Sequence, residues 1–199
     1  MILIMENYNT YIGRLDYSKL IQFAKDKGKI HIYHKKDFLI EQNKVSNQIG
    51  WIETGAFRYI YTGENGKEYV VEYSFAKEFV CDYSSFIHQG TSLVSIQAMS
   101  ECVVYLLSYQ DIVAFLKTDM ETLHFGKQVV DALYEMMYKR YLELYSDSPE
   151  EGYLKLMKRC PNLKEIAPLK EIASYLRVTP ETISHIRRKS VSYTHLRAH

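Results

Sequence analysis

The sequence has no long hydrophobic run. Its first five residues, MILIM, are apolar, but Glu6, Asn7 and Asn9 follow almost directly. A secretory signal needs roughly 7–15 consecutive apolar residues, and a membrane-spanning helix needs about 20. The short runs exclude both, so we expect a cytoplasmic protein with no membrane partner.

Cysteine is also scarce. Cys81, Cys102 and Cys160 form no CxxC pair and show no metal-site spacing with the histidines. In a cytoplasmic chain, such an odd and scattered set favours reduced, partly buried thiols over a disulfide or metal framework. The sequence also lacks a nucleophile elbow, a phosphate-binding glycine loop and a paired-carboxylate motif. We therefore expect neither an enzyme nor a bound cofactor or metal.

Neither sign of charge is in excess over the whole chain, whose formal net charge is +1, but the charges are unevenly placed. Residues 1–152 carry 15 Lys and Arg against 21 Asp and Glu, a balance of −6, whereas residues 153–190 carry 9 against 3, a balance of +6. A basic segment suits DNA, because neutralising phosphates releases condensed counterions. The alternative is a solvated basic face that has no partner.

Short apolar or alternating runs fill residues 29–107 and are separated by turn residues. The segment TGENGK (62–67) lies between two tyrosine-rich runs, and its Asn-Gly pair tolerates the positive φ of a tight hairpin. Together, the runs predict a β-sandwich, jelly roll or barrel of roughly 80 residues. An amphipathic helix over residues 16–27, closed by Gly28, is expected before it.

Residues 119–145 contain no proline and a single glycine, and they predict one long helix. A helix of this length spans about 40 Å, which exceeds the side of a small sandwich. Leucine, valine and methionine recur along it every seven residues. We therefore expect a coiled-coil-like homodimer interface, the alternative being a helix that packs only on its own domain. The expected interface residues are Leu123, Val130, Leu133, Met137, Tyr141 and Leu144.

Residues 169–189 read LKEIASYLRVTPETISHIRRK and predict two helices joined by a three-residue turn. Ala173 is small enough for the helices to cross closely, and Ile183 and Ile186 face back onto the first helix. Thr179 can cap the second helix. This is the spacing of a DNA-binding helix-turn-helix. The alternative is a helical hairpin that only packs within the protein and does not bind DNA.

The outward face of the second helix carries the residues expected to contact DNA. Glu181, His185 and Arg188 form one stripe, since they differ by four and three positions. Glu181 can accept from a cytosine amine, and His185 or Arg188 can donate to guanine. The other members of the set position the protein on phosphates. The complete predicted set is Lys170, Thr179, Glu181, Thr182, Ser184, His185, Arg187, Arg188 and Lys189.

This order of elements resembles the Crp/Fnr family of catabolite-activator-like regulators. The most specific stretches are GAFRYIYTGENGKEYVVEYSFAKEFV (55–80) and EIASYLRVTPETISHIRRK (171–189). The resemblance implies an α+β chain with an N-terminal double-stranded β-helix or jelly-roll sensor domain, a long dimerisation helix and a C-terminal helix-turn-helix. The expected boundaries are 1–117, 118–146 and 147–190, and residues 191–199 are expected to be a non-native or disordered tail.

The same resemblance implies particular partners. These are a second copy of the chain, a palindromic operator in double-stranded DNA, RNA polymerase and a small-molecule effector of unknown identity. The oxygen-sensing branch of the family holds an iron–sulfur centre on N-terminal cysteines, but no cysteine precedes Cys81. Arg177 stands where relatives often have a turn glycine, and His185 where many have arginine. The first predicts slight strain and the second an altered base preference.

At the effector site the sequence departs from the family pattern. Cyclic-nucleotide-binding members hold the ribose with a glycine–glutamate pair and the cyclic phosphate with an arginine–serine pair about ten residues later. The matching positions here are Cys81-Asp82 and Ser92-Leu93, so no cation stands at the phosphate position. Burying a phosphate without that charge is costly, so we expect no binding of cyclic AMP. The residues expected to line an effector pocket are Cys81, Asp82, Tyr83, Ser84 and Ser92.

Two other function classes stay open. A cupin-like, metal-dependent β-barrel protein would use histidines as ligands, but His31 and His34 are three positions apart, and strand alternation puts them on opposite faces. The second class is a ligand-binding module whose helix-turn-helix has lost DNA binding.

Overall fold

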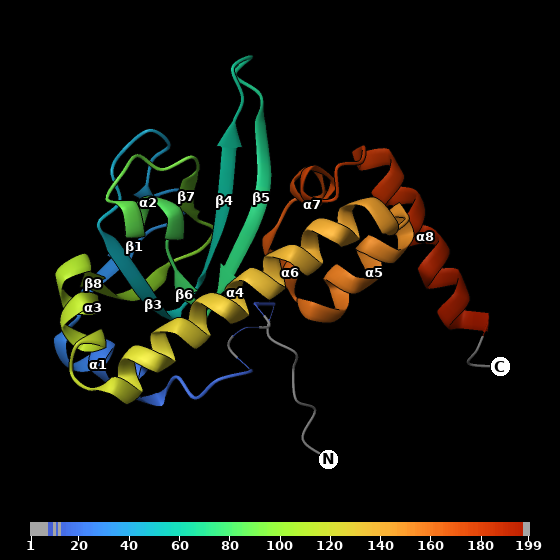
Figure 1. The fold of residues 1–199 in the computed structure, drawn as a ribbon. Helices are drawn as coiled ribbons and strands as arrows, with labels where there is room; N and C mark the ends of the chain where they lie inside the picture. Colours follow the sequence, from blue (N-terminus) through green and yellow to red (C-terminus); the bar gives the residue numbers. More distant parts are fainter. Residues whose placement is uncertain (1–7, 10, 12, 197–199) are drawn as a thin grey trace.

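The computed structural model describes the backbone of residues 8, 9, 11 and 13–196, and the side chains of this range up to Lys189. Figure 1 shows a β-domain, a long helix that runs along it, and a helical lobe at the far end of that helix. The expected mixture of antiparallel sheets and helices is confirmed.

Eight strands form the β-domain. They are β1 (Lys29–Tyr33), β2 (Phe38–Ile40), β3 (Gln48–Thr54), β4 (Ala56–Thr62), β5 (Glu68–Phe75), β6 (Phe79–Val80), β7 (Ser95–Ala98) and β8 (Cys102–Ser108). They make two antiparallel four-stranded sheets, β1-β8-β3-β6 and β2-β7-β4-β5. Ile52 and Val104 of one sheet and Phe57 and Ile96 of the other are fully buried in a shared core. Removing these apolar surfaces from water is the main stabilisation of the β-domain.

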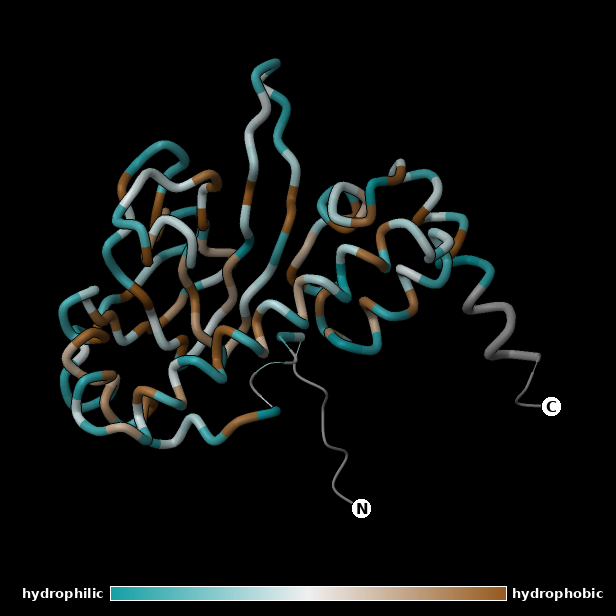
Figure 2. Tube along the Cα trace, in the orientation of Figure 1, coloured by the Kyte–Doolittle hydropathy of each residue, from teal (hydrophilic) through white to brown (hydrophobic). Residues whose placement is uncertain are grey.

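Strands β4 and β5 form a hairpin that projects from the β-domain (Figure 1). Its turn has the predicted Asn-Gly chemistry: Gly66 has a φ of 74°, and the side-chain oxygen of Asn65 accepts from the backbone N–H of Lys67 at 3.0 Å. Figure 2 shows a hydrophilic tip and hydrophobic segments lower on both strands. The stem of the hairpin therefore offers an apolar surface to a neighbour.

The helices are α1 (Ser18–Lys27), α2 (Tyr83–His88), α3 (Tyr109–Leu116), α4 (Met120–Ser146), α5 (Pro149–Arg159), α6 (Leu163–Ile166), α7 (Leu169–Tyr175) and α8 (Pro180–Leu196). The predicted long helix is confirmed as α4, which begins where the Asp119 side chain accepts from the N–H of Thr122 at 2.7 Å. Its N-terminal half packs with α1 and α3 on Trp51, Phe79 and Leu107.

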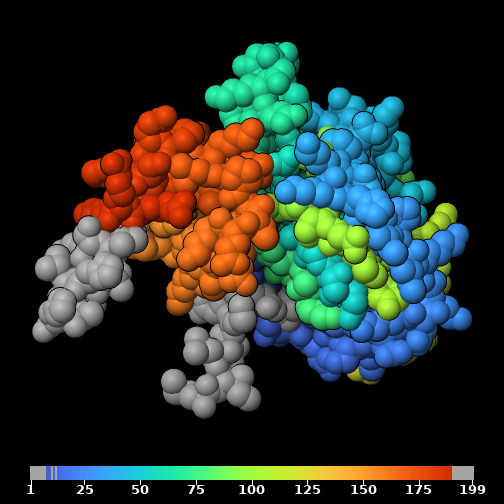
Figure 3. Space-filling view, turned by 180° about the vertical axis from the view of Figure 1, so that it is seen from behind, coloured from blue at the N-terminus to red at the C-terminus, as the bar shows by residue number. Residues whose placement is uncertain are grey.

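The C-terminal helices α5–α8 form the helical lobe, which Figure 3 shows beside the hairpin. Helix α5 begins at Pro149 behind a reciprocal Ser148–Glu151 capping box. A single hydrophobic cluster joins the lobe to the β-domain, with Leu163 and Ile172 on one side and Val70 and Tyr73 on the other. Helix α8 includes residues 191–196 of the segment expected to be a tail, and residues 197–199 lie outside the described part.

Candidate nucleic-acid interface

Helices α7 and α8 cross at the point that the sequence predicts. Ala173 is 1% exposed, and Ile183 and Ile186 of α8 are buried against α7. The backbone N–H of Val178 donates to the carbonyl of Ala173 at 3.0 Å, which closes the connection between the helices. The two helices therefore have one packed inner side and one outer side.

The turn between the helices has strained backbone at one residue. Arg177 has a φ of 57°, in the left-handed region that glycine adopts more readily than residues with a Cβ. This confirms the strain expected from an arginine at a position where glycine is common. Thr179 then caps α8, because its hydroxyl accepts from the N–H of Thr182 at 3.3 Å.

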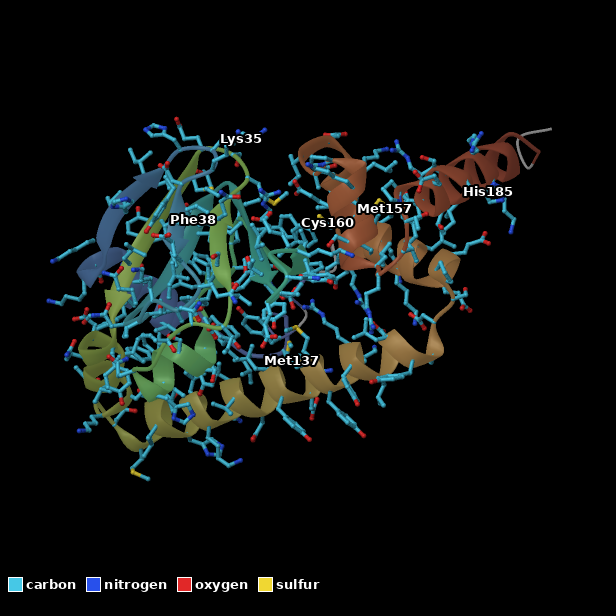
Figure 4. All side chains as sticks on the ribbon, turned by 90° about the horizontal axis from the view of Figure 1, so that it is seen from above. Lys35, Phe38, Met137, Met157, Cys160 and His185 are labelled. Carbon is cyan, nitrogen blue, oxygen red and sulfur yellow. The ribbon has the colours of Figure 1, made fainter. Side chains whose placement is uncertain are left out.

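The outer side of α8 carries the predicted stripe. Glu181, His185 and Arg188 are exposed at i, i+4 and i+7, while Thr182 and Ser184 beside them are half-buried. A hydrogen bond from its own backbone N–H and one from the Thr179 side chain lower the pKa of the Glu181 carboxyl. Its carboxylate is therefore a hydrogen-bond acceptor at neutral pH. Figure 4 shows His185 on α8, far from Lys35 and Phe38 of the β-domain.

The other basic residues of the predicted set lie on α7 and α8. Lys170 on α7 and Arg187 on α8 are exposed. Lys189 is engaged within the lobe, since its Nζ lies 2.8 Å from a carboxylate oxygen of Glu150 on α5. Both side chains are about half-exposed, so this ion pair is weak and Lys189 can leave Glu150 at little cost.

The structure also shows how the lobe is attached, which the sequence did not reveal. The guanidinium of Arg58 on β4 forms an ion pair with Glu171 on α7 and donates to Gln97 at 2.6 Å. The hydroxyl of Ser174 accepts from the N–H of Val70 at 3.0 Å. Helix α7 is thus held on the hairpin by partly buried polar contacts as well as by apolar packing. No local spacing signals these pairs, because their members lie about a hundred positions apart.

The residues predicted for an effector pocket are brought together in part. The Asp82 carboxylate accepts from the Ser92 hydroxyl at 2.7 Å and from the N–H of Leu93 at 3.2 Å. Burial raises the pKa of the Cys81 thiol to about 12, so it is a neutral thiol at physiological pH. Tyr83 and Ser84 lie at the start of α2 and are exposed. Of the five predicted residues, Asp82 and Ser92 are therefore joined directly by a hydrogen bond.

A cleft of about 1360 Å³ lies elsewhere, between the hairpin, the C-terminal half of α4, α5 and the turn before α8. Its described lining contains none of the five predicted effector residues. Tyr61 and Tyr69 line it from the hairpin, and Met137, Tyr141 and Leu144 line it from α4. Its charges are balanced by pairs such as Arg159 with Glu143 at 2.9 Å.

Helix α4 presents an apolar seam to solvent. Leu123, Val130, Met137, Tyr141 and Leu144 are all 41–54% exposed. Leu133 differs from the prediction, because it packs against the cluster beneath α4 in its own chain. Its neighbour Tyr134, 68% exposed, continues the alternating spacing of four and three residues.

None of the helices that the structure describes is both long and apolar enough to cross a membrane. Within the described part of the chain, no three His, Cys, Asp or Glu side chains gather as a metal site would require. His31 instead lies against the Tyr33 ring, and His34 is 3.8 Å from Glu101 on the surface. The cupin-like alternative is not favoured by this arrangement.

Comparisons with known proteins agree with the architecture. Residues 30–119 match the model of the cyclic nucleotide-binding domain family. No curated protein matches the chain. The structure of FixK2 from Bradyrhizobium japonicum has a TM-score of 0.71 at 12% identity, with 84% of this chain and 86% of that chain covered.

Two further solved structures share the fold. The global regulator CLP of Xanthomonas campestris has a TM-score of 0.62 at 15% identity, covering 90% of this chain and 93% of that one. The catabolite activator protein of Thermus thermophilus has a TM-score of 0.52 at 16% identity, covering 92% and 87%. The family match and the shared fold confirm the resemblance of this chain to Crp/Fnr regulators.

Proposed function

We propose that this chain is a sequence-specific DNA-binding transcription regulator that acts as a homodimer. The observation that carries the proposal is the α7–α8 pair: its inner side is packed at Ala173, while Glu181, His185 and Arg188 are exposed on the outer side of α8. This arrangement supports a helix-turn-helix whose second helix enters a major groove. Residues 153–190, which contain it, have a charge balance of +6.

The division of labour follows the sequence interpretation. Residues 1–117 are the sensor domain with a jelly-roll type of β-structure, 118–146 the dimerisation helix and 147–190 the DNA-binding domain. The exposed seam of α4 supports the dimer, because a monomer would leave Met137, Tyr141 and Leu144 in water. A twofold-symmetric dimer would read a palindromic operator. Contact with RNA polymerase is part of this proposal on the family resemblance alone.

The sensor domain is proposed to respond to an effector other than cyclic AMP. Ser92 lies where the family holds the phosphate and is itself bonded to the Asp82 carboxylate. A phosphate there would meet the uncharged Ser92 hydroxyl in place of an arginine, with the Asp82 carboxylate beside it.

Selection of preferred sequences from a random duplex pool tests the proposal. We expect a palindromic consensus with half-sites about one helical turn apart. Arg188→Ala should then remove discrimination at one base pair, by roughly 1–3 kcal/mol in bandshift titrations. Lys170→Ala is the matched control, since loss of a phosphate contact weakens all sequences alike and lowers the salt dependence by about one counterion.

Failure of the wild-type protein to enrich any sequence, or to bind duplexes at low ionic strength, would contradict the proposal. The chain would then be a ligand-binding module whose helix-turn-helix no longer binds DNA.

A further inference from the structure

The segment that contains Tyr8 and Asn9 is buried at the junction of the β-domain, helix α4 and the helical lobe. Tyr8 is 2% exposed and Asn9 is 4% exposed. Each of the three parts contributes a different kind of contact to the segment. Such burial is unusual so far from any strand or helix, because the first element, α1, begins only at Ser18.

The helical lobe contacts the segment through Tyr175, the last residue of α7. The Tyr8 hydroxyl donates to the Tyr175 hydroxyl at 2.8 Å, and the two rings lie edge to face with centroids 6.3 Å apart. The Tyr8 ring also packs edge-on against Tyr73 and Phe75 of β5, at 6.0 and 5.4 Å. One side chain thus joins the β-domain to the helix that precedes the turn into α8.

Helix α4 contacts the segment through Arg140. Its guanidinium carbon lies 4.4 Å from the centre of the Tyr8 ring, and its Nη2 donates to the Tyr8 carbonyl at 2.7 Å. Its Nη1 is paired with Glu72 of β5 at 2.5 Å. The Arg140 side chain is only 11% exposed, so these partners hold its charge in place.

Asn9 anchors the segment to the β-domain. Its backbone N–H and its side-chain amide donate to the two carboxylate oxygens of Glu78, at 2.9 and 2.6 Å. The same amide donates to the carbonyl of Tyr73 at 3.2 Å. Asn9 is therefore fixed to the β-domain, and the neighbouring Tyr8 contacts the lobe from this fixed position.

We propose that Tyr8 and Asn9 form a strap that fixes the orientation of the helix-turn-helix relative to helix α4. Tyr8, Arg140 and Tyr175 act as positioning residues for DNA binding, because none of them lies on the DNA-contacting face. The inference rests on the proposed function, since it assigns a role within the same DNA-binding dimer.

The strap favours DNA binding rather than blocking it. Lobe and strap meet at α7, whereas the stripe of Glu181, His185 and Arg188 on α8 stays exposed. In a dimer built on α4, fixing each helix-turn-helix to α4 also fixes the separation of the two recognition helices. A palindrome is then bound by two preoriented units, and the second contact forms at a high effective concentration.

The test compares a duplex carrying the selected palindrome with one in which a single half-site is scrambled. Tyr8→Ala should weaken binding to the palindrome by roughly tenfold while changing the half-site duplex by less than about twofold. Tyr8→Phe keeps the ring contacts and removes the donated hydrogen bond, so it should recover most of the loss. Tyr11→Phe is the matched control, since Tyr11 lies in the same segment but packs into the cluster around Tyr17 and Phe79.

A second measurement does not depend on DNA. Hydrogen exchange of the α7 amides should speed up in Tyr8→Ala, while the amides of β8 stay as slow as in the wild type. Two results would overturn the proposed role of the strap. One is an equal loss of affinity for both duplexes; the other is an unchanged ratio of the two duplex affinities together with unchanged hydrogen exchange in α7. A wild-type protein that binds no duplex while Tyr8→Ala still loosens α7 would instead count against the proposed function alone.

Discussion

Arg58 on strand β4 and Glu171 on helix α7 form an ion pair across the junction between the β-domain and the helical lobe. Their side chains are 22% and 10% exposed, and Gln97 accepts from the same guanidinium at 2.6 Å. The pair connects a strand of the β-domain to helix α7 of the helical lobe, two parts that we propose to be the sensor and the DNA-binding unit. Coupling between an effector and DNA affinity would have to pass through this junction or through the long helix α4.

Removing one member of this pair should be costly. Glu171→Ala leaves the partly buried Arg58 charge without its carboxylate, so we expect the free energy of unfolding to fall by about 2 kcal/mol. Urea denaturation measures the loss. Lys127→Ala is the control, because its pair with Asp131 is exposed on α4 and is worth at most about 0.5 kcal/mol. A loss as small as the control's would show that the pair is not a buried contact.

The strained turn predicts a stabilising substitution. Glycine adopts this positive φ without the steric cost of a Cβ, although it makes the unfolded chain more flexible. For Arg177→Gly we therefore expect a net gain of roughly 0.5 kcal/mol in the free energy of unfolding. Arg177→Val should destabilise, because a β-branched side chain tolerates this backbone poorly. Thermal unfolding of both variants checks the sign, and a destabilised glycine variant would refute the account of the turn.

The exposed seam of α4 predicts the oligomeric state. Met137→Glu places a charge at the centre of the proposed dimer contact, so we expect sedimentation to show monomers where the wild type gives dimers. Lys139→Glu lies on another face of the same exposed helix and should leave the dimer intact. Dimers that survive Met137→Glu would place the interface elsewhere.

Cyclic AMP should give no binding heat when titrated into the protein. The position that the family resemblance assigns to the phosphate-binding arginine is Ser92, an uncharged residue whose hydroxyl donates to the Asp82 carboxylate. As a positive control, the operator found by selection is titrated into the same sample, and its binding heat shows that the protein is active. Saturable heat at micromolar nucleotide would contradict the assignment of this site.

One surface carboxylate predicts a pH effect on stability. Hydrogen bonds and charge from Lys77, with further hydrogen bonds from Lys25 and the Trp51 indole, lower the pKa of Glu53 from its ordinary value of 4.5 to about 2. A pKa that is lower in the folded state adds stability above pH 4.5, and this stability is lost as the pH falls towards 2. Because Glu53 is partly solvated, we expect Glu53→Gln to cost about 1 kcal/mol at pH 7.

The same variant should cost almost nothing near pH 2, where the wild-type carboxyl is itself becoming protonated. Urea titrations of both proteins across this range measure the difference. If the difference in the free energy of unfolding between the two proteins were constant with pH, Glu53 would not titrate in the folded protein as its contacts require.

Local patterns in the sequence determined the elements of this protein. The cap at Thr179 and the Asn-Gly turn depend on residues within a few positions, and the crossing at Ala173 depends on Ile183 and Ile186, ten and thirteen positions further on. The helices and the hairpin could therefore be predicted. The periodicity of α4 was equally local. It did not distinguish Leu133, which packs inward, from Tyr134, which faces solvent, because that choice depends on where the β-domain lies under the helix.

The tertiary structure alone decided how these elements are joined. Arg58 meets Glu171, and Tyr8 meets both Arg140 and Tyr175, across separations of more than a hundred residues. Hydrogen-bond and charge complementarity at such a distance leaves no periodic trace in the chain, since any buried carboxylate or phenol could in principle be the partner. Packing of the helical lobe on the β-domain selects each pair, and it does so only once both parts are folded.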